Sequence, residues 1–318
     1  MKKLSFIILG MCMLGIQSYA QNVDFENDKS TWIHLSILIP DQEGEAITTG
    51  AKSYLTNKLK QIATKNGVAA NEDFSRFFIT TVITPLTKDV LPGPPAQIAE
   101  NLEMTFYIAD YYDQKVYSST SMEIKAIGTN DTKAYINGIK NINVNNKELA
   151  SFMDEGKKKI IAYYNARCAQ IMKIAQTKAD QKQYEAALYD LVSVPEVCDC
   201  YDEVLALSQK IYQQYIDNLC QINLAKARAA WAAHQNSSGA EDAGQYLSQI
   251  LPDASCYGDA MELYTEIKAK VLDDWKFEMK IYQDQVDLEK QRIEAMRQVG
   301  IAYGNHQQPV TTVFPWLR

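Results

Sequence analysis

Two similar cysteine-containing stretches constrain how the C-terminal half of this chain folds. The sequence reads "PEVCDCY" at 195–201 and "PDASCY" at 252–257, and each stretch follows a short run with helical spacing. Long helical patterns precede these short runs at 146–183 and 201–234, and a third begins near Tyr257. A unit of long helix, short return helix and proline turn is therefore written twice, which predicts an internal helical repeat.

The cysteine spacing predicts two disulfides inside this repeat. Residues at equal distances from the turn of an antiparallel helical hairpin lie side by side, within reach of a disulfide. We expect the two hairpins to reverse near residues 183 and 238. The predicted bonds are then Cys220–Cys256 and Cys168–Cys200, with Cys198 as the alternative partner of Cys168. Each would close a loop of roughly 30 residues and contribute on the order of 3 kcal/mol to stability.

One cysteine of the exported chain is then left single, and the repeated Cys-Tyr pair selects Cys198 for that place. A metal or redox role for the "CDC" stretch at 198–200 is the alternative. No histidine lies near it in the sequence, and cysteines of exported proteins are more often structural. We therefore expect a structural role.

The N-terminus has the pattern of a cleavable secretory signal, residues 1–20. Lys2 and Lys3 precede a 13-residue apolar core, and cleavage is expected after Ala20. A lipoprotein signal would need Cys12 at the modified position, where the preceding Met11 is too large. The sequence thus predicts an exported protein, periplasmic or secreted.

The bulk composition restricts the partners. With 47% hydrophobic and 22% charged residues the chain is globular, and its formal net charge is −7 with a pI of about 5.2. That charge argues against a general binder of nucleic acid or of anionic membranes. The basic run at 155–167 is expected to be a solvated helix face. No stretch after residue 20 approaches 18 uninterrupted apolar residues, so no stable membrane insertion is expected.

The first half alternates between strand and helix signals, which predicts an α+β fold. The expected elements are a strand at 32–39, a helix at 45–66, a strand at 76–84, an exposed loop at 91–97, a hairpin of strands at 102–110 and 115–128, and a helix after Gly128. We therefore predict a small mixed-sheet N-terminal domain followed by an all-α helical-hairpin repeat domain. The predicted boundaries are 1–20 signal peptide, 21–145 α+β domain, 146–300 helical repeat with disulfide staples, and 301–318 extended tail.

Two stretches resemble known families. The stretch "LEMTFYIADYYDQKVYSSTSMEIKAIGTNDTKAYINGI" (102–139) resembles periplasmic α+β domains of the curli-secretion (CsgG-type) and flagellar outer-membrane-protein (FlgT-type) kinds. The shared order is a strand ending in Asp, a turn, a return strand, a Gly and an alanine-containing helix. The resemblance implies a periplasmic, assembly-associated, non-catalytic module. The run "QYEAALYDLVSVP" (183–195) resembles a tetratricopeptide-type helical hairpin, although the unit of about 56 residues exceeds the usual 34.

The C-terminal region is the predicted partner-binding part. A long polar helix is expected over 276–299, and it would project or pair with another chain because its apolar stripe is thin. An extended aromatic tail at 309–318 follows, which docks on a partner or within this chain. The predicted partner-binding residues are Tyr282, Val286, Ile293, Met296, Phe314, Trp316 and Leu317.

Residues with catalytic potential are few. The three histidines, His34, His234 and His306, have no ligand-spaced companions, and the motifs of nucleotide-binding loops and serine hydrolases are absent from the sequence. We therefore predict no enzyme activity, no cofactor and no metal. The favoured function is a non-catalytic exported protein that mediates protein–protein interaction in a cell-envelope assembly. The alternatives are a small-molecule or glycan-binding protein that uses the 19 tyrosines for stacking, and, more distantly, a hydrolase.

Overall fold

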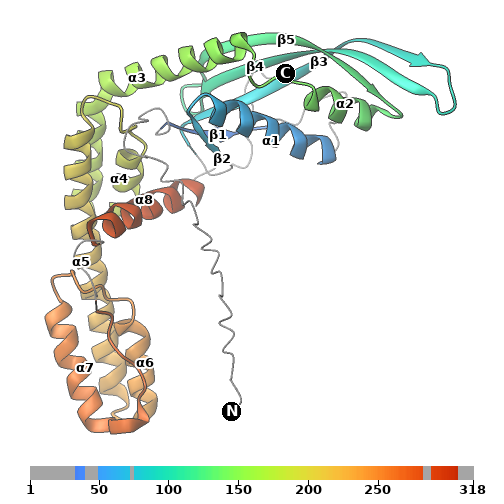
Figure 1. Ribbon diagram of the computed structural model, residues 1–318. Coiled ribbons are helices and arrows are strands. Elements are labelled where there is room, and N and C mark those ends of the chain that lie inside the picture. Colours follow the sequence, from blue (N-terminus) through green and yellow to red (C-terminus); the bar gives the residue numbers. More distant parts are fainter. Residues whose placement is uncertain (1–32, 40–48, 72–74, 282–287, 307–318) are drawn as a thin grey trace, which may run out of the picture.

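The computed structural model describes residues 33–39, 49–71, 75–281 and 288–306. Within them a five-stranded mixed sheet is followed by a helical region (Figure 1), as the sequence predicted for an α+β chain. The predicted signal peptide lies outside the described residues.

The sheet has the strand order β2-β1-β3-β4-β5. Its strands are β1 (His34–Ile37), β2 (Ala69–Asn71), β3 (Phe77–Leu91), β4 (Gln97–Asp110) and β5 (Val116–Gly128). Strand β1 is parallel to both β2 and β3, whereas β3, β4 and β5 form an antiparallel meander. Sequence reading missed β2, because three residues are too few to show a period.

The β3–β4 ribbon is longer than predicted. Pairing continues from Thr87 opposite Asn101 to Leu91 opposite Gln97, beyond the expected strand ends at 84 and 102. The register shifts between Pro85 and Thr87, so one residue on β3 is left over at this point. Residues 84–91 are all exposed, so this part of β3 has no alternation of buried and exposed positions from which a strand could be predicted.

The helices described are α1 (Thr49–Lys65), α2 (Asp131–Lys140), α3 (Lys147–Asp180), α4 (Tyr184–Val192), α5 (Tyr201–Ala233), α6 (Ser237–Leu247), α7 (Tyr257–Val271), a short 3-10 turn η2 (Leu272–Asp274) and α8 (Leu288–His306). Asn130 caps the N-terminus of α2, where its side chain accepts a hydrogen bond from the backbone N–H of Lys133.

Helices α1, α2 and α3 pack on one face of the sheet, which we call the helix face. The predicted strand at 102–110 is confirmed as part of β4, whose alternating residues Leu102, Met104, Phe106 and Ile108 point to this face and are fully buried. On α3, Phe152 stacks near Phe106 with 6.4 Å between ring centroids, and Gly156 lies directly on Ile108. On α2, Gly138 lies against Ile124 and Ala126 of β5.

Helix α3 joins the two halves of the molecule. Its 34 residues extend for about 50 Å, so it lies on the sheet at its start and passes beyond the sheet to α4 at its end (Figure 1). Buried residues of the sheet, of α3 and of the following helices form one continuous apolar cluster. The helical half is therefore built outward from the sheet through a single helix.

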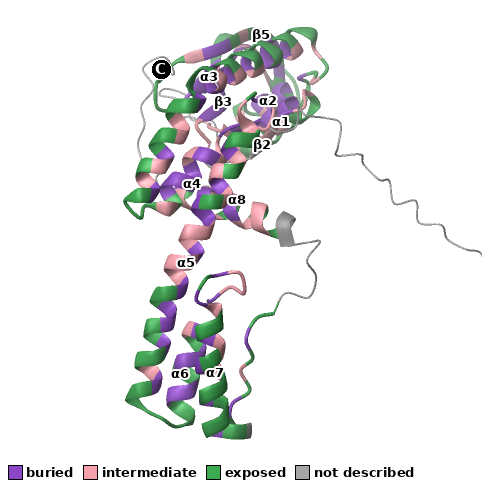
Figure 2. Ribbon diagram, turned by 90° about the vertical axis from the view of Figure 1, so that its left-hand side faces the viewer, coloured by how far each residue is buried: buried purple, intermediate pink, exposed green. Residues whose placement is uncertain are grey.

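The second long helix, α5, has two sets of neighbours. Its first half packs against α3, α4 and α8, and its second half against α6 and α7, as Figure 1 shows. Buried positions recur along both halves of α5 (Figure 2). The predicted alternation of long and short helices is present, but the tetratricopeptide resemblance is not confirmed. Helices of 34 and 9 residues, then of 33 and 11, are far from equal in length.

Both predicted disulfides are present. Cys168 of α3 is bonded to Cys200, and Cys220 of α5 is bonded to Cys256. Cys198 is the buried free thiol, as the repeat predicted. Cys200 and Cys256 are the residues that immediately precede α5 and α7, which explains why a Cys-Tyr pair is written twice. Each bond fixes the residue just before a new helix to the interior of the long helix before it.

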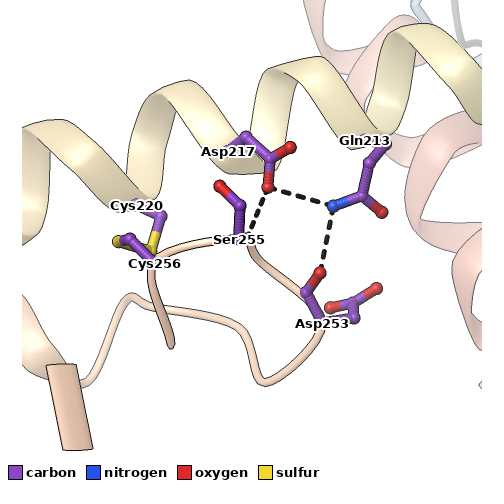
Figure 3. Close-up of a disulfide and its surroundings, with 6 residues drawn as sticks. All are labelled: Gln213, Asp217, Cys220, Asp253, Ser255 and Cys256. Carbon is purple, nitrogen blue, oxygen red and sulfur yellow. Dashed lines mark hydrogen bonds between the residues drawn. A yellow bond between two sulfur atoms is a disulfide. The ribbon is translucent and has the colours of Figure 1, made fainter. Parts of the chain in front are cut away.

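A set of hydrogen bonds surrounds the second disulfide (Figure 3). Asp217 Oδ1 accepts from the backbone N–H of Ser255 at 2.7 Å and from Gln213 Nε2 at 3.0 Å. The same Gln213 Nε2 donates to the carbonyl oxygen of Asp253 at 3.0 Å. These side chains of α5 hold the loop 252–256 in place, so the disulfide closes a segment that is already ordered by polar contacts.

We predict that removing the second disulfide is costly. The double variant Cys220→Ala/Cys256→Ala should lower the free energy of unfolding by about 3–4 kcal/mol, because the unfolded chain loses a 36-residue loop constraint. The measurement is urea unfolding followed by circular dichroism. Cys198→Ala is the control, and it should cost about 1 kcal/mol because only a buried thiol is lost. Equal losses in the two variants would contradict a stabilising cross-link.

Candidate functional site

The predicted C-terminal partner-binding helix is corrected by the structure. Residues 275–281 are not helical, and α8 begins only at Leu288, so no single helix covers 276–299. Helix α8 packs on α4 of its own chain, where Met296 is 2% exposed and Ile293 is half-buried. These two residues, which were predicted to bind a partner, therefore pack against other residues of the same chain. The others, Tyr282, Val286, Phe314, Trp316 and Leu317, lie outside the described residues.

Small residues explain why α8 packs internally. A Cβ atom at Gly300 would lie 2.7 Å from Val192 Cγ2, and one at Gly304 would lie 2.5 Å from the Tyr189 ring. The backbone of α8 thus touches α4 directly. Sequence reading searched for large apolar side chains on this helix and missed contacts that depend on their absence. Arg292 adds a polar link, since its Nη2 donates to Gln213 Oε1 at 2.7 Å.

We predict that a large side chain at Gly300 displaces α8. Gly300→Leu should lower the free energy of unfolding by about 1–3 kcal/mol, because the added atoms overpack the contact with α4. Amide hydrogen exchange in residues 288–306 should rise at the same time. The matched control is Gly258→Leu in α7, where a Cβ atom meets nothing within 4 Å. If both variants behave alike, α8 is not held by this contact.

A cleft lies where the sheet meets the helical half, and we call it the junction cleft. Its volume is about 590 Å³, and its walls come from the start of β3, the turn after β4, and helices α3, α4 and α8. The side chains that define it are Arg76, Tyr112, Tyr163, Tyr164, Arg167, Tyr189 and Tyr303. Two arginines and five tyrosines therefore converge from segments far apart in the sequence.

Arg76 has a structural role in this cleft. Its Nε donates to Asp110 Oδ2 at 2.8 Å, and its Nη2 lies 3.1 Å from Asp113 Oδ2. Burial acts to lower the pKa of Arg76, but the hydrogen bond and charge of Asp110 outweigh it, so the pKa is raised. Asp110 is fully buried and also accepts from the backbone N–H groups of Tyr112 and Asp113. The terminal Asp of the predicted hairpin thus holds its turn together.

Arg167 is the cation of the cleft that remains available. Its guanidinium stacks on Tyr163 at 4.3 Å from the ring centroid, and Arg76 stacks on the same ring at 4.6 Å. Arg167 is exposed, and in the described parts of the chain no carboxylate forms an ion pair with it. An exposed guanidinium fixed on an aromatic ring is suited to a carboxylate or phosphate group.

The surroundings of the cleft residues shift the pKa of two tyrosines and of Asp190. Burial raises the pKa of Tyr163 and of Tyr164, so both hydroxyls stay protonated at neutral pH. Burial also raises the pKa of Asp190, and the nearby Lys178, whose Nζ donates to Asp190 Oδ2 at 2.6 Å, partly offsets this effect. Because Tyr163 and Tyr164 are themselves buried, the groups that the cleft exposes include the Tyr112 ring, the guanidinium of Arg167 and the carboxylate of Asp113.

One pair of residues in this cleft could have been found from the sequence. Tyr163 and Arg167 are spaced i and i+4, which brings the two side chains together on one helix face. The basic run 155–167 was expected to be a solvated face, and Arg167 is exposed as that expectation implied. The contribution of Arg76, Tyr112 and Tyr303 depends on tertiary packing and has no sequence signal.

The histidines stand on different elements. His34 begins β1, His234 follows α5, and His306 ends α8. In the ranges that the structure describes, no group of three His, Cys, Asp or Glu side chains is arranged to hold a metal ion. The pKa of Cys198 is raised to about 11 by its burial and by the charge of Asp199, so its thiol is protonated at neutral pH.

The end of the β3–β4 ribbon, residues 86–97, is a second candidate surface, which we call the ribbon tip. Leu86, Val90 and Leu91 are 48%, 69% and 43% exposed, and Ile127 beside them on β5 is 48% exposed. The tip extends beyond the helices that cover the sheet (Figure 1). Its exposed loop 91–97 was predicted, but the apolar strand ends on either side were not.

Lys88 fixes the base of the ribbon tip. Its Nζ lies 2.8 Å from Asp131 Oδ1 at the start of α2 and 3.5 Å from Glu100 Oε1 on β4. These contacts connect both strands of the ribbon to the helix beside them. The apolar side chains are therefore presented on an anchored support.

The chain has little similarity to known proteins. No protein-family model matches the chain, and no curated protein matches it. Among solved structures, a minor lipoprotein from Acinetobacter baumannii is similar at 18% identity, with a TM-score of 0.24, over 41% of this chain and 92% of that one. A score this low carries no argument about function, and the curli-secretion and flagellar resemblance is not confirmed. In the described residues no helix is long and apolar enough to cross a membrane.

Proposed function

We propose that this chain is an exported, non-catalytic protein that mediates protein–protein contact in the cell envelope, and that the ribbon tip is its contact surface. The N-terminal signal pattern supports export, and two disulfides are typical of proteins that fold in an oxidising compartment. Contact with a partner is supported by one observation, the exposed apolar side chains of the tip.

The energetics of the tip favour a partner. Burying a large aliphatic side chain contributes about 1.5–3 kcal/mol, and this chain leaves Leu86, Val90 and Leu91 of β3 and Ile127 of β5 exposed at this end of the sheet. Val90 and Leu91 are successive residues of β3 and point to opposite faces of the ribbon, so a partner at the tip would contact both faces. Exposed apolar side chains that gather in one region mark interaction sites more often than scattered residues do. Because Lys88 anchors the strands, little conformational entropy is lost when a partner covers them.

The proposal predicts a contact that depends on the tip. A photo-crosslinking amino acid at Val90, introduced into the full-length protein in its native cells, should give one adduct of defined mass. The triple variant Leu86→Ser/Leu91→Ser/Ile127→Ser should abolish that adduct and leave the melting temperature nearly unchanged, because these side chains are exposed.

The matched control places the same crosslinker at Ile222, an aliphatic residue of α5 that is 43% exposed. It should give no adduct of that mass. Identical adducts from both positions, or no adduct from Val90, would contradict a partner at the tip.

A second function, binding of a small molecule or glycan, is favoured by the junction cleft. The ring of Tyr112, which is 51% exposed, can stack on a sugar ring, and the exposed guanidinium of Arg167 is suited to a carboxylate on such a ring. The chemical class that fits is therefore an acidic sugar. The hydrolase alternative gains no supporting observation among the described residues.

The cleft proposal predicts selective binding of glucuronic acid over glucose, measured by saturation-transfer NMR on the mature protein. Arg167→Ala should reduce the glucuronic acid signal at least five-fold, because the charge-assisted hydrogen bonds are lost. Arg228→Ala on α5, where the arginine is also exposed but lies outside the cleft, should leave the signal unchanged. Equal signals for glucose and glucuronic acid would argue against recognition of the carboxylate.

A further inference from the structure

The face of the sheet opposite the helices, which we call the second face, contains its own buried cluster. Phe78 is 1% exposed and Ala109 is fully buried, and both point away from α1, α2 and α3. Thr80, two residues along β3 on the same face, is also fully buried. The described residues that pack on this cluster are Leu38, Val82, Tyr107 and Tyr111.

These neighbours are not sufficient to bury the cluster. They belong to the sheet strands or to the segments directly after them, so their backbones lie in the plane of the sheet. Side chains stand roughly perpendicular to a sheet, and a second layer about 10 Å away is needed to cover them. Thr80 Oγ1 is also buried without a hydrogen-bond partner among the described residues, a costly state for a hydroxyl group. A further segment must therefore lie over this face.

The shape of the buried area indicates a single extended segment. Residues 77–83 on β3 and 106–109 on β4 are apolar or aromatic with few interruptions, as in strands that are covered on both faces. The same face of β5 is polar, and Thr105 of β4 forms a 2.8 Å hydrogen bond with Ser121 there. The apolar area is therefore a strip about two strands wide, which suits a peptide in extended conformation better than a helix or another sheet.

We propose that the C-terminal segment 307–318 of this chain lies on the second face. Helix α8 ends at His306, and its residue Tyr303 lines the junction cleft together with Tyr112. From Tyr112 the aromatic contacts continue to Tyr111 at 5.8 Å and from Tyr111 to Phe78 at 6.3 Å. The cleft thus leads from the end of α8 to the buried strip.

The length and composition of the segment match the strip. Twelve extended residues span about 40 Å, whereas β3 from Phe77 to Thr84 spans about 25 Å. The segment supplies the apolar side chains Val310, Val313, Phe314, Trp316 and Leu317. The segment 40–48 is a poorer match because it is mostly polar. Phe314 and Trp316 then belong to a core of this chain and do not bind a partner.

The test is photo-crosslinking within the full mature chain. A benzoylphenylalanine at Tyr107, on the second face, should crosslink to residues 307–318, as identified by mass spectrometry. An equal mixture of ¹⁴N- and ¹⁵N-labelled protein should show that both peptides come from one chain. The matched control is the same substitution at Tyr54 of α1, an exposed tyrosine on the other side of the sheet, which should give no such product. Crosslinks from Tyr107 to residues 21–32 or 40–48, crosslinks between copies, or none would overturn the proposal.

A second measurement does not depend on crosslinking geometry. Phe314→Ser/Trp316→Ser should lower the melting temperature by about 5–10 °C, because two aromatic side chains leave a buried site. The control Thr311→Ser/Thr312→Ser in the same segment should change it by about 1 °C. Equal shifts in the two double variants would overturn the proposal.

Discussion

The contact of α3 with the sheet is the interaction on which the rest of the structure depends. Gly156 has no side chain, so α3 lies directly on Ile108, and Phe152 fills the space beside Phe106. The first part of α3 is fixed by this packing, and the second part extends past the sheet, where α4 and α5 pack against it. Everything that follows in the chain, from α4 to α8, is positioned by the direction that these contacts impose on one helix.

The two disulfides fix the later helices relative to α3. Cys168 lies on α3 and is bonded to the residue that begins α5, and Cys220 lies on α5 and is bonded to the residue that begins α7. Each long helix thereby sets the starting point of the next. The far half of α5, with α6 and α7, lies away from the sheet (Figure 1), so the bond between Cys220 and Cys256 fixes the start of α7 to α5 without help from the sheet.

The sequence predicted the structure best where the pattern was local, as in the alternation of residues along a strand or the number of residues between a cysteine and a turn. Alternation on β4 identified its buried face, and equal distances from a turn identified both disulfides, because hairpin geometry is local. It was least informative for contacts made by small residues. Gly300 and Gly304 bring α8 onto α4, and a pattern search for large apolar side chains classified that helix as a free surface. The junction cleft was beyond prediction for the same physical reason, since Arg76 and Tyr303 meet only through tertiary packing.

The β3–β4 ribbon has a buried part and an exposed part. From Phe77 to Ile83, five of the seven β3 residues are apolar, and all are buried except Val82, which is half-buried. From Thr84 to Leu91 every residue is exposed, yet four of the eight are still apolar or proline. Apolar side chains on the enclosed part are explained by the fold of the chain itself. Those on the exposed part are not, because polar residues would sustain the same backbone pairing at the end of a ribbon. The apolar character of the tip is therefore the feature of this ribbon that the proposed contact with a partner would explain.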